Sequence, residues 1–342
     1  MKRSTRWLLV AGLACASMVF SVGGALAHTS AAPRLLGAWT TTDSPYAVAA
    51  DPLGDVWVAY SDTPRIARLN SMGVQQVSIP LDPSVRPLAI ATDAAGDAFI
   101  TDTNNDTISK YTRAGTLVGT WDESGHIYEV TGIAVAPDGS IYVSDYGNDA
   151  VAKFDANGGF LTEFGSGLVS VPGGITTDAS GNVYVADTGD QQVIEFSSSG
   201  SMLGKFGSEG SGAGQFELPA YIATYGSQLL VSDENNNRVQ LFSTGGTFLN
   251  QWGSGGDMNG LFTNPLGVSV DVAGNAYVAD QGNARIQKFY IGPSPCTGVT
   301  RTKGELTLCG KAQAKCLANP VPTSEKSCMS KVQIAYTRFR HK

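Results

Sequence analysis

Residues 274–280 read GNAYVAD, and close copies of this heptapeptide recur along the chain. The other copies are GDVWVAY (54–60), GDAFITD (96–102), GSIYVSD (139–145), GNVYVAD (181–187) and GSQLLVSD (226–233). The last residues of successive copies lie 42, 43, 42, 46 and 47 positions apart. Repeats of this length are typical of helical arrays or of the blades of a β-propeller, and the strand-like patterning here selects blades.

Each repeat predicts four short strands. In the fourth repeat we expect strands over 174–177, 183–186, 193–196 and 202–206, separated by turns rich in Gly, Ser and Asp. Six such units in a ring would bury both faces of every blade between its neighbours. The sequence therefore predicts an all-β protein, a six-bladed β-propeller.

The two ends of the repeat array complement each other. Fourth strands are predicted at 117–121, 160–164, 202–206 and 248–252, but none follows the last third strand at 285–289. The segment LLGAW (35–39) has the pattern of a fourth strand and lacks a repeat of its own. We expect this N-terminal strand to pair with the last blade, which would close the ring and remove an open sheet edge.

The repeats resemble those of the NHL-repeat family, six-bladed propellers whose repeat reads roughly P-x-G-I-A-V-D-x-x-G-N-x-Y-V-A-D-x-x-N-x-R-I-Q-x-F. The sixth repeat carries nearly all of this pattern, in Pro265, Gly267, Val268, Asp271, Gly274, Asn275, Tyr277, Val278, Asp280, Asn283, Arg285, Ile286, Gln287 and Phe289. The first repeat departs most, because Tyr60 takes the Asp position and Pro64 lies in the following loop. The resemblance covers about 28–292 and implies, for an extracytoplasmic member, a sensor or interaction module.

Composition and charge agree with an all-β protein and disfavour one class of partner. The chain of 342 residues contains 41 glycines, and only 15% of its residues are charged. The formal net charge of −7 divides unevenly, because residues 28–292 hold 11 basic and 28 acidic residues whereas residues 293–342 hold nine basic and two acidic ones. An acidic propeller would repel a phosphate backbone, so we do not expect nucleic acid as a partner.

The N-terminus has the features of an export signal. Lys2, Arg3 and Arg6 precede an uncharged run over 7–27 that ends in Ala-Leu-Ala. A basic stretch, an apolar stretch and a small-residue site predict cleavage after Ala27, so that residues 1–27 are a signal peptide and the protein is secreted or extracytoplasmic, with no membrane span once the signal is removed. The alternative is an uncleaved anchor, since the run is long enough to cross a bilayer.

Four cysteines fall in the C-terminal tail, residues 293–342: Cys296, Cys309, Cys316 and Cys328. In an exported chain such clustering predicts two disulfides, for which three connectivities exist. A zinc site would call for closer C-x₂₋₄-C pairs. We therefore expect a small, basic, disulfide-bonded tail.

A recurrent aspartate ends the second strand of most repeats, in Asp102, Asp145, Asp187, Asp233 and Asp280. A carboxylate at this place can accept hydrogen bonds from backbone N–H groups of the next few residues and fix the turn. A ring of carboxylates could also hold an ion. The repetition of this aspartate in nearly every blade favours the structural role.

The expected channel offers no catalytic group. The inner-strand columns read Ala47, Ala89, Gly132, Gly174, Tyr221, Gly267 and Ala49, Ala91, Ala134, Thr176, Ala223, Ser269. None of these is a carboxylate or an imidazole, which six-bladed lactonases and the amidating lyase need to hold a metal. Of three histidines, His28 lies at the cleavage site and His341 in the tail, which leaves His126. We predict no catalytic residue, no metal and no cofactor.

A binding face is expected where the loops between second and third strands meet the segments that join one blade to the next. Aromatic, Arg and Asn side chains on these loops suit a binding patch: Tyr46, Arg86, His126, Tyr128, Tyr146, Asn148, Asn236, Arg238, Asn264 and Arg285. The sequence thus favours a non-catalytic, monomeric module that binds a protein, peptide or glycan at the cell envelope. The alternative is a metal-dependent hydrolase or lyase with its site on the channel axis.

Overall fold

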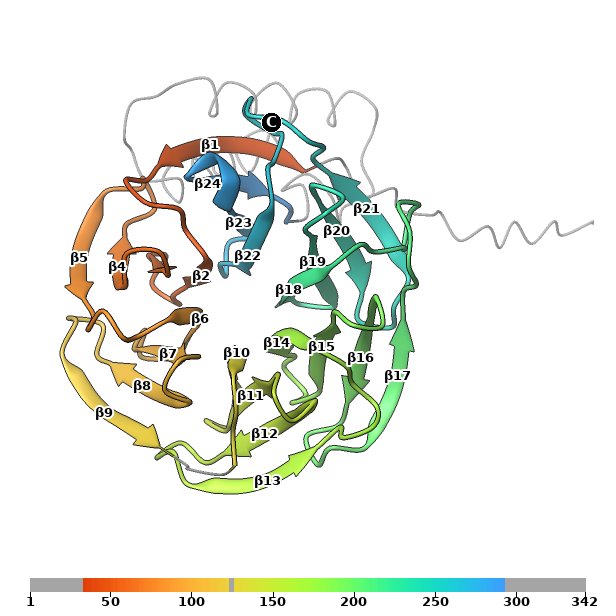
Figure 1. The fold of residues 1–342 in the computed structure, drawn as a ribbon. Coiled ribbons are helices and arrows are strands. Elements are labelled where there is room, and N and C mark those ends of the chain that lie inside the picture. Colours follow the sequence, from red (N-terminus) through yellow and green to blue (C-terminus); the bar gives the residue numbers. More distant parts are fainter. Residues whose placement is uncertain (1–32, 123–125, 293–342) are drawn as a thin grey trace, which may run out of the picture.

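The computed structural model describes residues 33–122 and 126–292, which form a ring of six antiparallel sheets around a central axis (Figure 1). Each sheet has four strands and forms one blade. The predicted signal peptide, the mature N-terminus at His28, and the tail with its four cysteines and His341 lie outside the described residues.

The strands follow one another from the axis outward in each blade. Blade 1 consists of β2 (Ala47–Ala50), β3 (Val56–Tyr60), β4 (Arg65–Leu69) and β5 (Gln75–Pro80), and blade 2 of β6 (Pro87–Thr92), β7 (Ala98–Asp102), β8 (Thr107–Tyr111) and β9 (Leu117–Asp122). Blade 3 consists of β10 (Val130–Val135), β11 (Ile141–Asp145), β12 (Ala150–Phe154) and β13 (Phe160–Phe164), and blade 4 of β14 (Pro172–Thr177), β15 (Val183–Asp187), β16 (Gln192–Phe196) and β17 (Met202–Phe206). Blade 5 consists of β18 (Pro219–Tyr225), β19 (Gln228–Asp233), β20 (Arg238–Ser243) and β21 (Phe248–Trp252).

Blade 6 is built from both ends of the propeller. It contains β22 (Pro265–Val270), β23 (Asn275–Asp280), the 3₁₀ turn η1 (Gln281–Asn283) and β24 (Arg285–Tyr290), and its outer strand is β1 (Arg34–Thr40). β1 pairs antiparallel with β24, from Arg34 opposite Tyr290 to Thr40 opposite Arg285. The predicted fold class and the closing N-terminal strand are both confirmed.

The core lies between blades rather than within them. The second strands of the blades are buried over their whole length, as in β3, β7, β11, β15 and β23, because a neighbouring blade covers each of their faces. One hydrophobic cluster, for example, combines Phe99 and Ile108 of blade 2 with Ile133 and Val143 of blade 3. Continuous apolar runs are expected for strands that are buried on both sides.

Cations on the third strands lie over aromatic rings on the second strands. Arg68 lies over Trp57, Lys110 over Phe99, Lys153 over Tyr142 and Lys288 over Tyr277, with 6.0, 4.8, 5.1 and 5.4 Å to the ring centroids. In blade 4 the corresponding pair is Tyr184 and Glu195, and the tyrosine hydroxyl donates to Glu195 Oε1 at 3.0 Å. The pairing that recurs between strands is therefore aromatic with cation, and blade 4 replaces it by a hydrogen bond.

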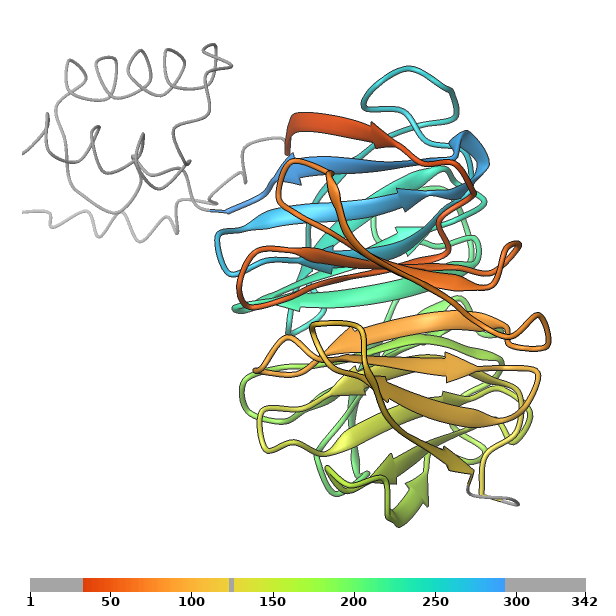
Figure 2. The ribbon, with the colours of Figure 1, turned by 90° about the vertical axis from the view of Figure 1, so that its left-hand side faces the viewer.

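The ring has two different faces, seen edge-on in Figure 2. One face, here called the turn face, carries the tight turns between the first and second strands and between the third and fourth, and the chain reaches it at Ile291, whose N–H donates to the Gly274 carbonyl. The opposite face, the loop face, carries the loops after the second strands and the segments between blades. Among the described residues no helix is long and apolar enough to cross a membrane.

Candidate functional site

The recurrent aspartates fasten the segments between blades to the loop face. Their Oδ1 atoms accept backbone N–H groups at 2.7–3.1 Å from residues 16 or 17 positions earlier in the chain: Arg86 to Asp102, Tyr128 to Asp145, Ser170 to Asp187, Glu217 to Asp233 and Thr263 to Asp280. The predicted bonds within the local turn also occur, from the N–H groups of Asn104 and Asn148. The aspartates thus bind the local turn as well as the incoming segment, which supplies the donor that recurs in all five blades.

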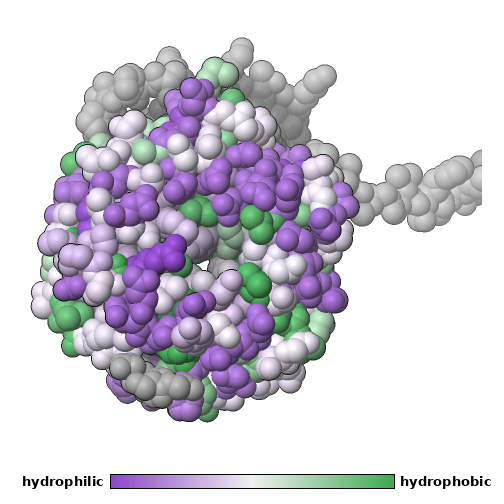
Figure 3. Space-filling view, viewed as in Figure 1, coloured by the Kyte–Doolittle hydropathy of each residue, from purple (hydrophilic) through white to green (hydrophobic). Residues whose placement is uncertain are grey.

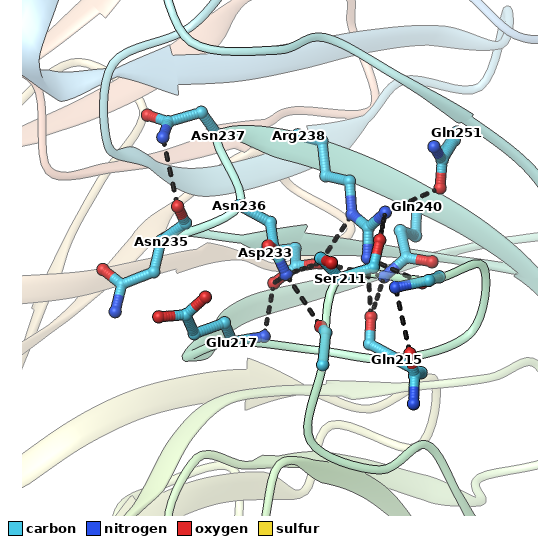
Figure 4. A network of polar contacts seen from close by, with 12 residues as sticks. Ser211, Gln215, Glu217, Asp233, Asn235, Asn236, Asn237, Arg238, Gln240 and Gln251 are labelled. Atoms are coloured by element: carbon cyan, nitrogen blue, oxygen red, sulfur yellow. Dashed lines mark hydrogen bonds and ion pairs between the residues drawn. The ribbon is translucent and has the colours of Figure 1, made fainter.

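Buried arginines complete this anchoring in blades 5 and 6. Arg238 Nε donates to Asp233 Oδ2 at 2.7 Å, and its other nitrogens reach the carbonyls of Ser211, Gly212 and Gln215 (Figure 4). Arg285 repeats the arrangement, with Asp280 at 2.6 Å and three carbonyls of the segment before β22. These arginines are only 5% and 7% exposed, so they lie beneath the predicted binding face rather than on it.

Blade 1 has a similar ion pair, in which the arginine keeps its place at the start of the third strand and the carboxylate comes from another segment. Tyr60 takes the aspartate position, and the carboxylate is supplied instead by Asp43 in the segment before β2. Arg65 binds Asp43 at 2.8 Å, and its guanidinium lies 3.5 Å above the centre of the Tyr60 ring. The departure of the first repeat from the pattern is thus compensated across the loop face.

Blades 2, 3 and 4 lack an arginine at the start of the third strand, where Thr107, Ala150 and Gln192 stand instead. In blade 2, Asp102 receives the Asn105 amide at 2.6 Å. Asp145 receives the Asn148 amide, and Asp187 receives the Gln192 amide at 2.6 Å. Burial raises the pKa of Asp145 and of Asp187, and these hydrogen bonds only partly offset it. Without a cation, the fold disfavours the negative charge of these two carboxylates relative to water.

Side chains at the start of the third strands clasp one blade to the next. The side chains of Asp106, Asp149, Gln191 and Asn237 accept the N–H groups of Glu129, Val171, Leu218 and Asn264 in the following segments, at 2.6–3.0 Å. All of these residues have φ between 49° and 58°, a conformation that is uncommon outside glycine. These contacts between blades were not predicted from the sequence, although the recurring Asp, Asn or Gln four residues after the repeat aspartate is a signal for them.

The remaining predicted residues divide into two groups on the loop face. His126 is exposed, and its ring stacks on Phe160 with centroids 3.9 Å apart, at the junction of β9 and β13 on the outer edge. Tyr128 and Tyr146 are exposed, by 53% and 40%, and lie in neighbouring loops at blade 3, where Gly147 donates to the Tyr128 carbonyl. Asn148, in the same loop, and Asn236 bind the repeat aspartates of their own blades.

A different group surrounds the mouth of the central channel on the loop face. Tyr46 and Arg86 come from the segments that enter blades 1 and 2, and the Arg86 guanidinium is near enough to the Tyr46 hydroxyl to lower its pKa. Glu234 comes from the loop of blade 5 and accepts the Asn264 amide, at the entry to blade 6, at 3.4 Å. In Figure 3 strongly hydrophilic residues border part of the central opening, and hydrophobic residues also lie close to it. Glu234 was not predicted from the sequence.

Tyr221 forms the floor of this mouth. It is the one large residue in a column of Ala and Gly, and its hydroxyl crosses from blade 5 to donate to the Leu88 carbonyl of blade 2 at 2.6 Å. Gly174 of the neighbouring strand leaves room for the backbone there, because a Cβ would lie 2.6 Å from the Tyr221 Cα. Alanine at position 174 would therefore push these inner strands apart.

Beyond Tyr221 the channel continues as a cavity of about 220 Å³ that is lined by all six inner strands. Its hydroxyl groups already bind neighbouring blades: Thr92 donates to the Ala50 carbonyl, Thr224 to the Thr177 carbonyl, and Ser269 accepts the Ala50 N–H. The predicted column of Ala49, Ala91, Ala134, Thr176, Ala223 and Ser269 does line the channel. Many of the side chains that line the cavity are thus small, and its hydroxyl groups form hydrogen bonds between neighbouring blades.

The charges at the mouth are perturbed by burial. Burial raises the pKa of Glu234, and the Asn264 amide opposes that rise. Burial also raises the pKa of Tyr46, and the Arg86 charge partly opposes this rise. The pKa of Tyr221 is raised by burial as well, and the nearby Glu234 charge raises it further. Within residues 33–122 and 126–292, no group of three or more His, Cys, Asp or Glu side chains has a metal-binding arrangement. The mouth therefore offers a cation, a carboxylate and two phenols.

Comparison with known proteins supports the fold. Streptogramin B lyase shares 15% identity over 76% of this chain and 98% of its own, with a TM-score of 0.56. A catalytically inactive histidine-to-alanine variant of virginiamycin B lyase from Staphylococcus aureus, solved with quinupristin, shares 18% over 72% and 80%, with a TM-score of 0.54. A chain of the nidogen–laminin complex shares 20% over 60% and 79%, with a TM-score of 0.51.

Sequence comparison identifies the repeat itself. No curated protein sequence matches the chain. The family model for the NHL repeat matches residues 262–289, which run from the end of the segment before β22 through β24. Together with the six sheets of the ring, this match means that the chain is a six-bladed β-propeller that carries an NHL repeat.

Proposed function

We propose that this chain is an extracytoplasmic binding module that holds a protein, peptide or glycan of the cell envelope at the mouth of its channel. The observation that carries the proposal is the convergence of Tyr46, Arg86, Glu234 and Asn264, from four different blades, around one opening. The stability of any single blade does not require that these four side chains, which come from different blades, meet at one opening.

The chemistry of the mouth supports binding. Tyrosine and arginine are enriched among the residues that contribute most to interfaces. The segments that carry Arg86 and Asn264 are fastened through their backbone N–H groups to Asp102 and to Asn237. Such preorganisation lowers the conformational cost of binding.

The test is retention of envelope material on the immobilised protein, with identification by mass spectrometry. The variant Arg86→Gln/Glu234→Gln removes both charges of the mouth. Lys205→Gln/Glu163→Gln removes one cation and one carboxylate from the exposed outer strands β17 and β13 and serves as the matched control. Species retained by the native protein and the control, but lost from the mouth variant, support the proposal, and equal retention by all three contradicts it.

A second candidate is a metal-dependent hydrolase or lyase that acts at the same mouth. It is favoured by Glu234, because a partly buried carboxylate with a raised pKa at the mouth of a channel is a candidate for proton transfer. Two of the solved structures with this fold are lyases, one of them with quinupristin. Incubation with quinupristin, with and without added divalent metal, tests this candidate: a change in the mass or chromatographic retention of quinupristin that disappears in Glu234→Gln would favour it.

A further inference from the structure

The mouth of the channel places a cation without a carboxylate partner opposite a carboxylate without a cation. Five arginines of the described residues, Arg65, Arg68, Arg113, Arg238 and Arg285, form ion pairs with aspartates. The exposed Arg86 differs from these five, because among the described residues no ion pair includes it, and the group it is seen to affect is the Tyr46 hydroxyl. It therefore keeps most of its five N–H donors for another group.

Glu234 is the counterpart on the other side of the channel. It lies in blade 5, and blade 5 faces blade 2 across a ring of six. Its side chain accepts one long hydrogen bond, 3.4 Å from the Asn264 amide, although a carboxylate has room for about four. Because the group is also partly withdrawn from water, an ammonium ion would compensate its charge better than solvent does.

Tyr221 limits what can reach these two groups. One tyrosine side chain and one hydrogen bond, from its hydroxyl to the Leu88 carbonyl, span the whole channel between blades 5 and 2. A ligand that contacts both Arg86 and Glu234 above this floor is therefore short.

We propose that the mouth binds a small zwitterion, a free amino acid or a short peptide with both termini free, with the carboxylate on Arg86 and the ammonium group on Glu234. This inference rests on the proposed binding function and specifies its ligand. A ligand with one charge would satisfy one side of the mouth and leave the opposite charge desolvated, which disfavours it. Tyr46 and Tyr221 then supply the walls and the floor.

The experiment is calorimetric titration of the exported protein with alanyl-alanine and alanyl-phenylalanine, each in its free form, N-acetylated and C-amidated. We expect capping of either terminus to weaken binding by at least about tenfold, the equivalent of one charge-assisted hydrogen bond. In Arg86→Gln the free acid and the amide should bind alike, and in Glu234→Gln the free and the acetylated peptide should bind alike. Lys205→Gln and Glu163→Gln should bind as the native protein does.

Two results would overturn the inference. The first is that neither free dipeptide binds, and the second is that the free and capped forms bind equally. Circular dichroism and thermal unfolding of each variant verify that the propeller remains folded. If the dipeptides fail while envelope material is still lost from the mouth variant, the zwitterion is wrong and the binding function stands. If the mouth variant also retains envelope material normally, both fail.

Discussion

At the scale of single residues, position in the ring decides whether a charged side chain anchors the segments between blades or stays exposed at the channel mouth. Arg285 and Arg86 carry the same group, yet the first is buried against Asp280 and three carbonyls, whereas the second is exposed beside Tyr46. The repeat pattern predicts the first kind, because it requires an arginine five positions after the aspartate. It says nothing of the second kind, since Arg86 belongs to no repeated motif.

The Arg285–Asp280 pair gives the first prediction. Arg285→Ala leaves the fully buried Asp280 carboxylate without its cation and frees the segment that contains Met258 and Leu261. Breaking one side of a buried pair typically costs about 3–5 kcal/mol. We expect a loss of that size in the free energy of unfolding measured with denaturant, whereas Arg86→Ala, at an exposed site, should change it by less than about 0.5 kcal/mol. Equal effects of the two substitutions would contradict the assignment.

Asp187 gives a prediction on pH. Its pKa is raised by burial, so the folded protein binds a proton more readily here than the unfolded chain, whose aspartate has a pKa near 3.8. The stability that this group contributes is therefore fully present below the unfolded pKa and is lost as the pH rises through the folded one. Between pH 4 and 7, Asp187→Asn should remove part of the pH-dependent fall in stability, measured as the denaturation midpoint. Glu209→Gln, at an exposed site in the segment between β17 and β18, is the control, and identical pH profiles for native protein and Asp187→Asn would refute the claim.

At the scale of elements, the strands were predictable and their cross-ring contacts were not. A buried strand such as β23 is predicted by a run of apolar residues between turn signals. The strand β1 was recognisable because the last repeat lacked a fourth strand. The mouth depends instead on contacts such as Tyr221 with Leu88, which are 133 residues apart. No local pattern encodes that contact, because it depends on the number of blades and on which blades face each other.

Removal of β1 tests the closure directly. A chain without residues 34–40 would leave β24 as an open edge in the last blade and would lose the packing of Trp39 on Tyr277, whose rings lie 5.6 Å apart. Unpaired edges favour association between chains. We expect aggregation or a broadened, less cooperative thermal transition, seen by light scattering and circular dichroism. An unchanged, monomeric transition would show that the ring closes without this strand.

At the scale of the whole molecule, the segments beyond the described propeller give two predictions. The first is that the exported chain begins at His28 and that Cys296, Cys309, Cys316 and Cys328 form two disulfides. The intact mass should then lack residues 1–27 and one further hydrogen for each of these cysteines, and the denatured, unreduced protein should contain no free thiol. A full-length mass in the membrane fraction would contradict the cleavage, and four free thiols would contradict the disulfides.

The last prediction concerns the division of charge between propeller and tail. Residues 28–292 hold 11 basic and 28 acidic residues, against nine basic and two acidic ones in residues 293–342. The propeller's last described residue, Gly292, lies against Gly274 on the turn face, which also presents the exposed carboxylate of Asp138. A tail tethered there has an effective concentration near the propeller on the order of millimolar.

Exposed ion pairs are each worth only about 0–1 kcal/mol and are screened at physiological salt. We therefore expect the basic tail to release the acidic propeller and to bind a more densely charged anionic surface when one is available. Full mature protein should cosediment with vesicles that contain anionic lipid at low salt and dissociate at high salt, whereas a chain that ends at Gly292 should stay in solution, because its net charge repels the surface. Vesicles of neutral lipid are the control. Equal sedimentation of both chains, or binding that salt leaves unchanged, would show that the basic tail does not direct the protein to anionic surfaces.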